Sequence, residues 1–252
     1  MVNLTYDGSW YGFLSAVFDV YERKLKQVSI LKETLYMPEA FAGRFEVFTD
    51  NKKAERVWNG LLKQLPVASC KNIYCCYLSE IPGIENSLLR FIQLAFSTKQ
   101  ADKAFANPDV LRVSQVAKMV YRERHRMEAF VRFKLTKDNI YFAEIDPDFN
   151  VLPLLVDHFQ KRYADQVWII YDLRRKYGIY YNLENVEEIT FATSEIKEAK
   201  GDSSVFEESE ELYQTLWKDY FQHVNIEERK NTKLHLRHVP KRYWKYLVEK
   251  GL

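Results

Sequence analysis

The chain has 252 residues and a formal net charge of +2, and 47% of its residues are hydrophobic. This length is enough for one large domain or two small ones, and the apolar content is enough for a buried core. No run approaches the roughly 20 apolar residues that a bilayer span requires, and the polar start lacks the features of a secretory signal. The three cysteines, Cys70, Cys75 and Cys76, form an odd set that argues against a secreted disulfide framework. We therefore expect a soluble cytoplasmic protein without a membrane segment.

The N-terminal part is predicted to combine one short strand with helices. Residues Val2–Tyr6 are typical of a strand, which turns at Asp7 and Gly8 into a helix capped by Ser9. From Trp10 onward, apolar residues recur at the spacing of one helical stripe. A second amphipathic helix is predicted after Asp50.

The pattern breaks at residues 81–83, where Pro82 and Gly83 interrupt the helical spacing. We place a boundary there, between an N-terminal α/β subdomain, 1–84, and a C-terminal α+β domain, 85–252. Beyond it, the pair Asn107-Pro108 is a typical helix start, and the helix is predicted to reach about His125.

The middle of the chain predicts a sheet. A hairpin is expected from Phe130–Leu135 and Ile140–Asp146, followed by a helix over Leu152–Tyr163 and by strands at Val167–Tyr171 and Ile179–Asn182. The mixture indicates an α+β fold, in which a mixed or antiparallel sheet with a central hairpin is covered by helices.

The small net charge hides three segments of opposite sign. Residues 112–137 hold eight Lys or Arg against two carboxylates, residues 184–219 hold eleven carboxylates against three Lys, and residues 227–250 hold eight Lys or Arg against three carboxylates. Local fields of this kind steer charged partners. The distribution predicts one phosphate-facing side.

The two basic segments also contain aromatic residues, which suits a nucleic acid: Arg and Lys neutralise phosphates, and exposed rings stack on unpaired bases. A charged, solvated surface without a nucleic-acid partner is the alternative. The predicted contact residues are Arg122, Arg124, His125, Arg126, Arg132, Arg229, Lys230, Lys241, Arg242, Tyr243, Trp244 and Lys245.

Catalytic signatures are sparse. The eight glycines form neither a phosphate-binding loop nor a dinucleotide fingerprint, and we expect neither a cofactor nor a bound metal. The best acidic set is Glu144, Asp146 and Asp172, which could hold Mg²⁺ in a nuclease-like site. The alternative is structural: Asp146 belongs to a turn before a helix, and Asp172 pairs with an arginine.

Three stretches together resemble a family of bacterial DNA metabolism or DNA repair proteins. They are Tyr6–Phe18, Glu123–Phe133 and Glu228–Lys245. The resemblance implies a neighbouring radical-SAM protein of DNA modification or repair, and the portion from about Leu88 resembles a domain of unknown function that is also fused to uracil-DNA glycosylases. Where the family's middle stretch usually has Gly, this chain has Ala129.

These observations lead to one main hypothesis and two alternatives. We expect a DNA metabolism or repair accessory protein that binds nucleic acid and works with a radical-SAM or glycosylase partner. The first alternative is a metal-dependent nucleic-acid-processing enzyme. The second is an adaptor that binds only proteins, through its polarised charge.

Overall fold

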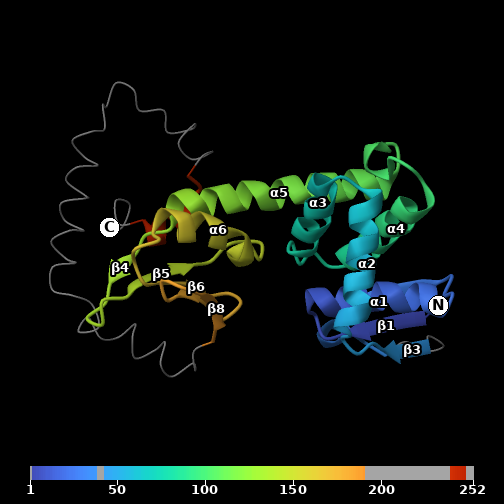
Figure 1. Cartoon of the computed structure of the whole chain (residues 1–252), viewed down its shortest axis with the longest axis horizontal. Helices are drawn as coiled ribbons and strands as arrows, with labels where there is room; N and C mark the ends of the chain where they lie inside the picture. The colour runs from blue at the N-terminus through green and yellow to red at the C-terminus, as the bar shows by residue number, and fades with distance from the viewer. Residues whose placement is uncertain (1, 39–42, 191–238, 248–252) are drawn as a thin grey trace. The chain divides into compact units, whose positions relative to one another are not determined.

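A computed structural model of the chain describes residues 2–38, 43–190 and 239–247 (Figure 1). The chain forms two compact units, Met1–Tyr121 (unit 1) and Arg122–Leu252 (unit 2). Helices and two sheets are present, so the α+β prediction is confirmed. In the part of the chain that the structure describes, no helix is long and apolar enough to cross a membrane.

Unit 1 contains a parallel sheet with strand order β2-β1-β3. Its strands are β1 (Val2–Tyr6), β2 (Val28–Lys32) and β3 (Gly43–Glu46). The predicted first strand is confirmed, as is the helix cap, because the hydroxyl of Ser9 accepts a hydrogen bond from the Gly12 N–H at 2.9 Å. The strands β2 and β3 were not predicted. Every residue of β3 is exposed, so its sequence lacks the alternation that marks a half-buried strand.

The helices of unit 1 contribute most of its buried apolar residues. They are α1 (Trp10–Glu22), α2 (Asn51–Gln64), α3 (Val67–Tyr77), α4 (Ile84–Ser97) and the first part of α5 (Pro108–Phe130), with short 3₁₀ segments η1 (Glu33–Leu35) and η2 (Ala101–Lys103). As predicted, α2 starts after Asp50, whose carboxylate accepts from the backbone N–H groups of Lys52 and Lys53. The fully buried Phe13, Leu61 and Leu88 come from three of these helices.

The two compact units divide within α5, between Tyr121 and Arg122. The boundary predicted from the sequence, between residues 84 and 85, falls in another place, at the start of α4. Since α4 packs against α2 and α3, residues on both sides of position 84 belong to unit 1. These compact units do not test which segments are domains, so the division into 1–84 and 85–252 stays a prediction.

Unit 2 is built on a five-stranded sheet with strand order β4-β5-β6-β7-β8. The strands β5 and β6 are parallel and the other neighbours are antiparallel. The elements are β4 (Lys134–Leu135), β5 (Tyr141–Ile145), α6 (Leu152–Arg162), β6 (Trp168–Asp172), β7 (Tyr177–Tyr181), β8 (Val186–Ile189) and the 3₁₀ segment η5 (Lys241–Tyr246). Since α6 connects the parallel pair, β5, α6 and β6 form a βαβ unit.

The predicted hairpin forms, but at the edge of the sheet and with a shorter first strand. The helix α5 continues to Phe130, beyond the predicted end at His125, and β4 keeps only two residues. The extension is stabilised locally, because Arg124 pairs with Glu128 one turn later at 2.7 Å. The sequence pattern of alternating residues around 131–135 therefore overstated the strand.

Candidate nucleic-acid interface

The carboxyl ends of β5 and β6 meet at one edge of the sheet, because the two strands are parallel. Ile145 pairs in register with Asp172, and Asp146 follows β5 directly. Open α/β sheets place their ligand-binding loops at this edge. Two of the three carboxylates that the sequence suggested, Asp146 and Asp172, are thus neighbours in the fold.

Asp172 holds the turn that follows β6. Its buried carboxylate accepts hydrogen bonds from the backbone N–H groups of Arg174 and Arg175 at 2.9 and 3.1 Å, and from the Arg175 guanidinium at 2.8 Å. Burial raises the pKa of Asp172, and the Arg175 side chain and these N–H groups oppose that rise. The interpretation that Asp172 pairs with an arginine is confirmed.

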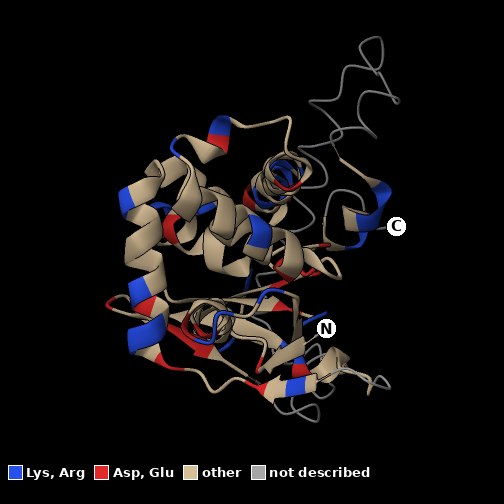
Figure 2. Ribbon diagram, turned by 90° about the vertical axis from the view of Figure 1, so that its right-hand side faces the viewer, with Lys and Arg blue, Asp and Glu red and all other residues tan. Residues whose placement is uncertain are grey.

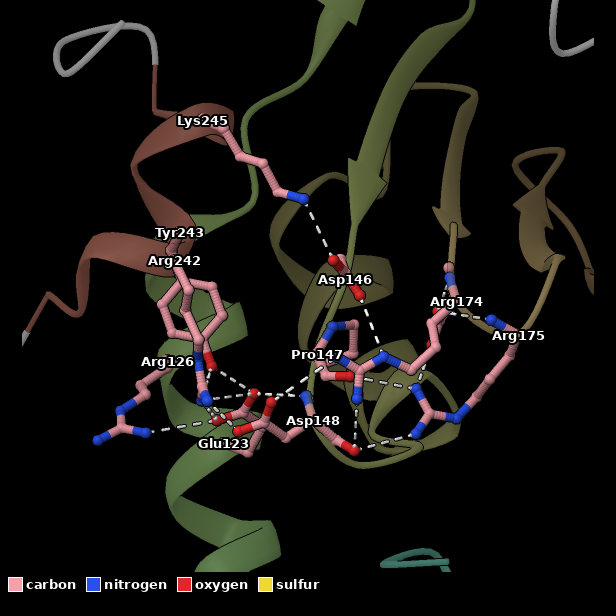
Figure 3. Close-up of polar contacts among 11 residues, drawn as sticks. Glu123, Arg126, Asp146, Pro147, Asp148, Arg174, Arg175, Arg242, Tyr243 and Lys245 are labelled. Atoms are coloured by element: carbon pink, nitrogen blue, oxygen red, sulfur yellow. Dashed lines mark hydrogen bonds and ion pairs between the residues drawn. The ribbon is translucent and has the colours of Figure 1, made fainter.

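Asp146 lies between two cations. Arg174 donates to one carboxylate oxygen and Lys245 to the other, each at 3.2 Å (Figure 3). Burial alone would raise the pKa of Asp146, but Lys245 and Arg174 hold it below its usual range. The carboxylate is therefore ionised at neutral pH and connects the turn after β6 to the C-terminal segment.

Figure 3 shows Glu123 among Arg126, Arg242, Tyr243 and Asp148. The Glu123 side chain is 2% exposed, and its carboxylate accepts from the Arg242 guanidinium at 3.0 Å, from the Asp148 N–H at 2.9 Å, and from the Tyr243 hydroxyl. Arg126 donates to the same carboxylate at 3.4 Å. Burial, with the neighbouring Glu123 carboxylate, raises the pKa of Tyr243 far above its usual range, so the phenol stays a donor.

These contacts place two distant basic segments side by side. Arg242 and Tyr243, in η5, reach Glu123 in α5 across 119 and 120 positions of the chain. The Tyr243 ring also packs on Phe130, with ring centres 5.5 Å apart. The segments 122–126 and 241–245, predicted separately to contact nucleic acid, therefore form one surface of unit 2, which we call the basic surface.

Residues 82–249 match the family described as a domain of unknown function, DUF4130. The chain belongs to this family. No curated protein matches its sequence. Among solved structures, the chain is similar to a pGpG-specific phosphodiesterase, PggH, from Vibrio cholerae, with 9% sequence identity and a TM-score of 0.34 over 79% of this chain and 95% of the other. A likeness at that TM-score carries no argument about function.

The matched DUF4130 region contains the whole basic surface, whose cations differ in how they are held. Arg122 and Lys241 are exposed and form no ion pair with any residue that the structure describes. His125 is also exposed, with 87% of its side chain accessible, 3.6 Å from Glu128. Figure 2 marks the cations of η5 in blue, close to the end of the chain labelled C.

Other predicted contact residues have structural roles. Arg132 donates to the backbone carbonyl of Ala129 at 2.7 Å. Tyr243 is 1% exposed, so it offers no ring face to a base, contrary to the stacking role expected from the sequence. The half-buried Trp244 donates its indole N–H to the Val239 carbonyl at 3.1 Å. Arg229 and Lys230 lie outside the described residues.

The metal-site alternative receives no support from the described part of the family domain. Within those residues, no group of three or more His, Cys, Asp or Glu is placed to hold a metal ion. Glu144 lies on β5, two residues before Asp146, and Asp172 is fully buried against Arg175. The candidate carboxylates Asp146 and Asp172 are thus occupied by arginine and lysine side chains.

Glu123 and Asp148 organise the basic surface, and neither was predicted from the sequence as a site residue. A signal for Glu123 was present, because it continues the buried stripe of α5: Val116, Val120 and Met127 are buried, and Glu123 falls at the same helical spacing. A carboxylate on the buried face of a helix needs partners. The partners could not be named, since Arg242 lies 119 residues away.

Proposed function

We propose that this DUF4130 protein binds nucleic acid through the basic surface of unit 2 and acts as an accessory protein in DNA metabolism. The observation that carries the proposal is the joining of segments 122–126 and 241–245 through Glu123. Together the two segments hold six Lys or Arg. Four of them pair with Glu123, Glu128, Asp146 or Asp148, and Arg122 and Lys241 pair with no carboxylate among the described residues. Such a surface favours phosphate contacts, which supply most of the affinity of non-specific DNA binding.

The cations divide into two classes with different tasks. Arg242 and Arg126 are tied to the buried Glu123, which fixes their guanidinium groups in place. Arg122 and Lys241 are exposed beside them. A fixed guanidinium matches phosphate oxygens with its planar fork, and an exposed cation without a partner can release condensed counterions from the DNA.

An accessory role fits the chemistry better than strand cleavage. The carboxylates Asp146 and Asp172 already accept hydrogen bonds from Arg174, Arg175 and Lys245, so they are not free to bind Mg²⁺. On this proposal the chemistry is supplied by a partner enzyme, such as a radical-SAM protein or a uracil-DNA glycosylase, and this chain holds the DNA.

A salt titration of DNA binding tests the proposal, with a double variant, R122Q/K241Q, that removes two exposed cations and leaves the Glu123 cluster intact. Each lost phosphate contact on duplex DNA changes the slope of log K against log salt by about 0.9. We expect the slope to become shallower by about 1.8, and affinity to fall for single-stranded, duplex and uracil-containing DNA alike.

The matched control is K52Q/K63Q, which removes the same charge from exposed positions of α2 in unit 1. We expect this control to bind DNA as the unmodified protein does. Equal losses in both double variants would mean that total charge, not the basic surface, sets the affinity. If the unmodified protein binds no form of DNA, the charged surface instead serves a protein partner, which mass spectrometry after a pull-down would identify.

A further inference from the structure

Unit 1 contains a cavity of about 180 Å³ that the proposed function does not use. Most of its lining residues belong to α3, α4 and the first turns of α5, and these helices are labelled in Figure 1. The segment that joins α4 to α5 forms its rim. The lining residues are Ser69, Asn72, Phe91, Asp102, Lys103, Phe105, Val110, Val113 and Ser114.

The helical spacing of the lining residues explains why they share one space. Ser69 and Asn72 lie three residues apart on α3, and Val110, Val113 and Ser114 lie three and four residues apart on α5. Residues at these spacings occupy one face of a helix. The two faces therefore turn their side chains toward the same cavity.

The cavity has an apolar floor and an aromatic rim. Phe91, Val110 and Val113 are at most 3% exposed, so they form the buried side. Phe105, in contrast, is 54% exposed although it lines the cavity. A half-exposed phenylalanine at the rim offers a ring face on which a flat ligand can stack.

Polar groups in the cavity have unused hydrogen-bonding capacity. Asp102 accepts from the Ser69 hydroxyl through Oδ2 at 2.9 Å, while its Oδ1 accepts no hydrogen bond from the described residues. Within those residues, the Asn72 amide and the Ser114 hydroxyl also make no side-chain hydrogen bond. The site thus combines an amide, which donates and accepts, with a carboxylate oxygen, which only accepts.

We propose that this cavity binds a single nucleobase, with a preference for bases that carry an exocyclic amino group. A cavity of about 150 Å³ holds one benzene ring, so a space of about 180 Å³ suits one pyrimidine ring. The base edge presents adjacent donors and acceptors that match Asn72, and the amino group donates to Asp102. Phe105 stacks on the ring.

The test is calorimetry on the full chain with free cytosine and uracil, which have the same size and differ in the amino group. We expect cytosine to bind several-fold tighter than uracil. Phe105→Ala is expected to weaken cytosine binding about ten-fold, and Ser114→Phe to abolish it by filling the cavity. The matched control is Phe48→Ala, which removes a phenylalanine that is 78% exposed in the same unit and does not line the cavity; it should bind cytosine normally.

Several outcomes would overturn the assignment. These are the absence of binding for either base, unchanged cytosine affinity in a folded Phe105→Ala variant, and a benzene affinity equal to that of cytosine. If uracil bound as tightly as cytosine, Asp102 would not accept from the amino group, and the proposed preference for amino-bearing bases would be wrong. Because free bases carry no phosphate, the R122Q/K241Q variant should bind cytosine normally, so this test and the salt titration fail independently.

Discussion

The carboxyl ends of β1 and β5 each carry an aspartate, but the two aspartates have different neighbours. At the end of β1, Asp7 accepts hydrogen bonds from the N–H and the hydroxyl of Ser9 at 2.9 and 2.7 Å. At the end of β5, Asp146 lies between Arg174 and Lys245. The Ser9 N–H and hydroxyl hold Asp7 in a turn that starts a helix. The partners of Asp146 are instead the charged, partly exposed side chains of Arg174 and Lys245. A carboxylate at the end of a parallel strand therefore says little about function until its partners are known.

The largest effect is expected where a cation compensates a buried carboxylate. Arg175→Met leaves Asp172, which is 0% exposed, without its guanidinium. Removing one partner of a buried ion pair costs about 3–5 kcal/mol, and the backbone N–H groups that remain favour the lower value. Urea unfolding at neutral pH measures this loss. The control is Arg174→Met, whose guanidinium is half exposed and whose loss should cost less than about 1 kcal/mol.

The loss in Arg175→Met should depend on pH. Burial raises the pKa of Asp172 in the folded protein, so ionisation lowers stability as the pH rises through that folded pKa. Arg175 opposes this effect, and its removal makes ionisation more costly. The stability difference between the two proteins should therefore be small near pH 4 and should grow toward neutral pH. A difference that stays constant over this range would show that Asp172 does not titrate as described.

A smaller but more informative loss is expected for Glu123→Gln. Both Glu123 oxygens accept hydrogen bonds, from Asp148 and Tyr243 at one and from Arg242 at the other. An amide NH₂ cannot accept, so one set of donors is left without its partner, at a cost of about 2–3 kcal/mol. Amide hydrogen exchange in residues 241–247 should speed up, because the segment loses its anchor to α5.

The control for Glu123→Gln is Glu128→Gln on the same helix. Glu128 pairs with Arg124 at an i, i+4 spacing, a contact worth about 0.5 kcal/mol. Exchange in residues 241–247 should stay slow in this variant. Fast exchange there in the unmodified protein would contradict the anchoring role of Glu123.

Contacts between residues close in the sequence could be predicted, and contacts between distant segments could not. The strand Val2–Tyr6 and the cap at Ser9 are local features, and both were predicted correctly. The pairing of Asp172 with Arg175 was also foreseeable, because the two residues are three positions apart. The contact between Glu123 and Arg242 was not, since it depends on tertiary packing. A count of charges predicted the basic surface but could not show which cations were neutralised, or that Tyr243 was buried.

The smallest effect is expected at the end of β1. Burial alone would raise the pKa of Asp7, but hydrogen bonds from Ser9 and Thr49 hold it below its usual range. Because the folded pKa is lowered, the ionised Asp7 carboxylate stabilises the folded protein above the unfolded pKa. This contribution is lost as the pH falls through the folded pKa. Asp7→Asn keeps an acceptor oxygen for the Ser9 N–H, so we expect a loss below about 1 kcal/mol at neutral pH. The loss should shrink as the pH is lowered, because protonation of Asp7 makes the two proteins more alike.

Gly12 lies close to the Asp7 side chain. A Cβ at position 12 would lie 2.2 Å from an Asp7 carboxylate oxygen, so Gly12→Ala should lower the free energy of unfolding more than Asp7→Asn does. The reverse order would show that the carboxylate does not occupy this position.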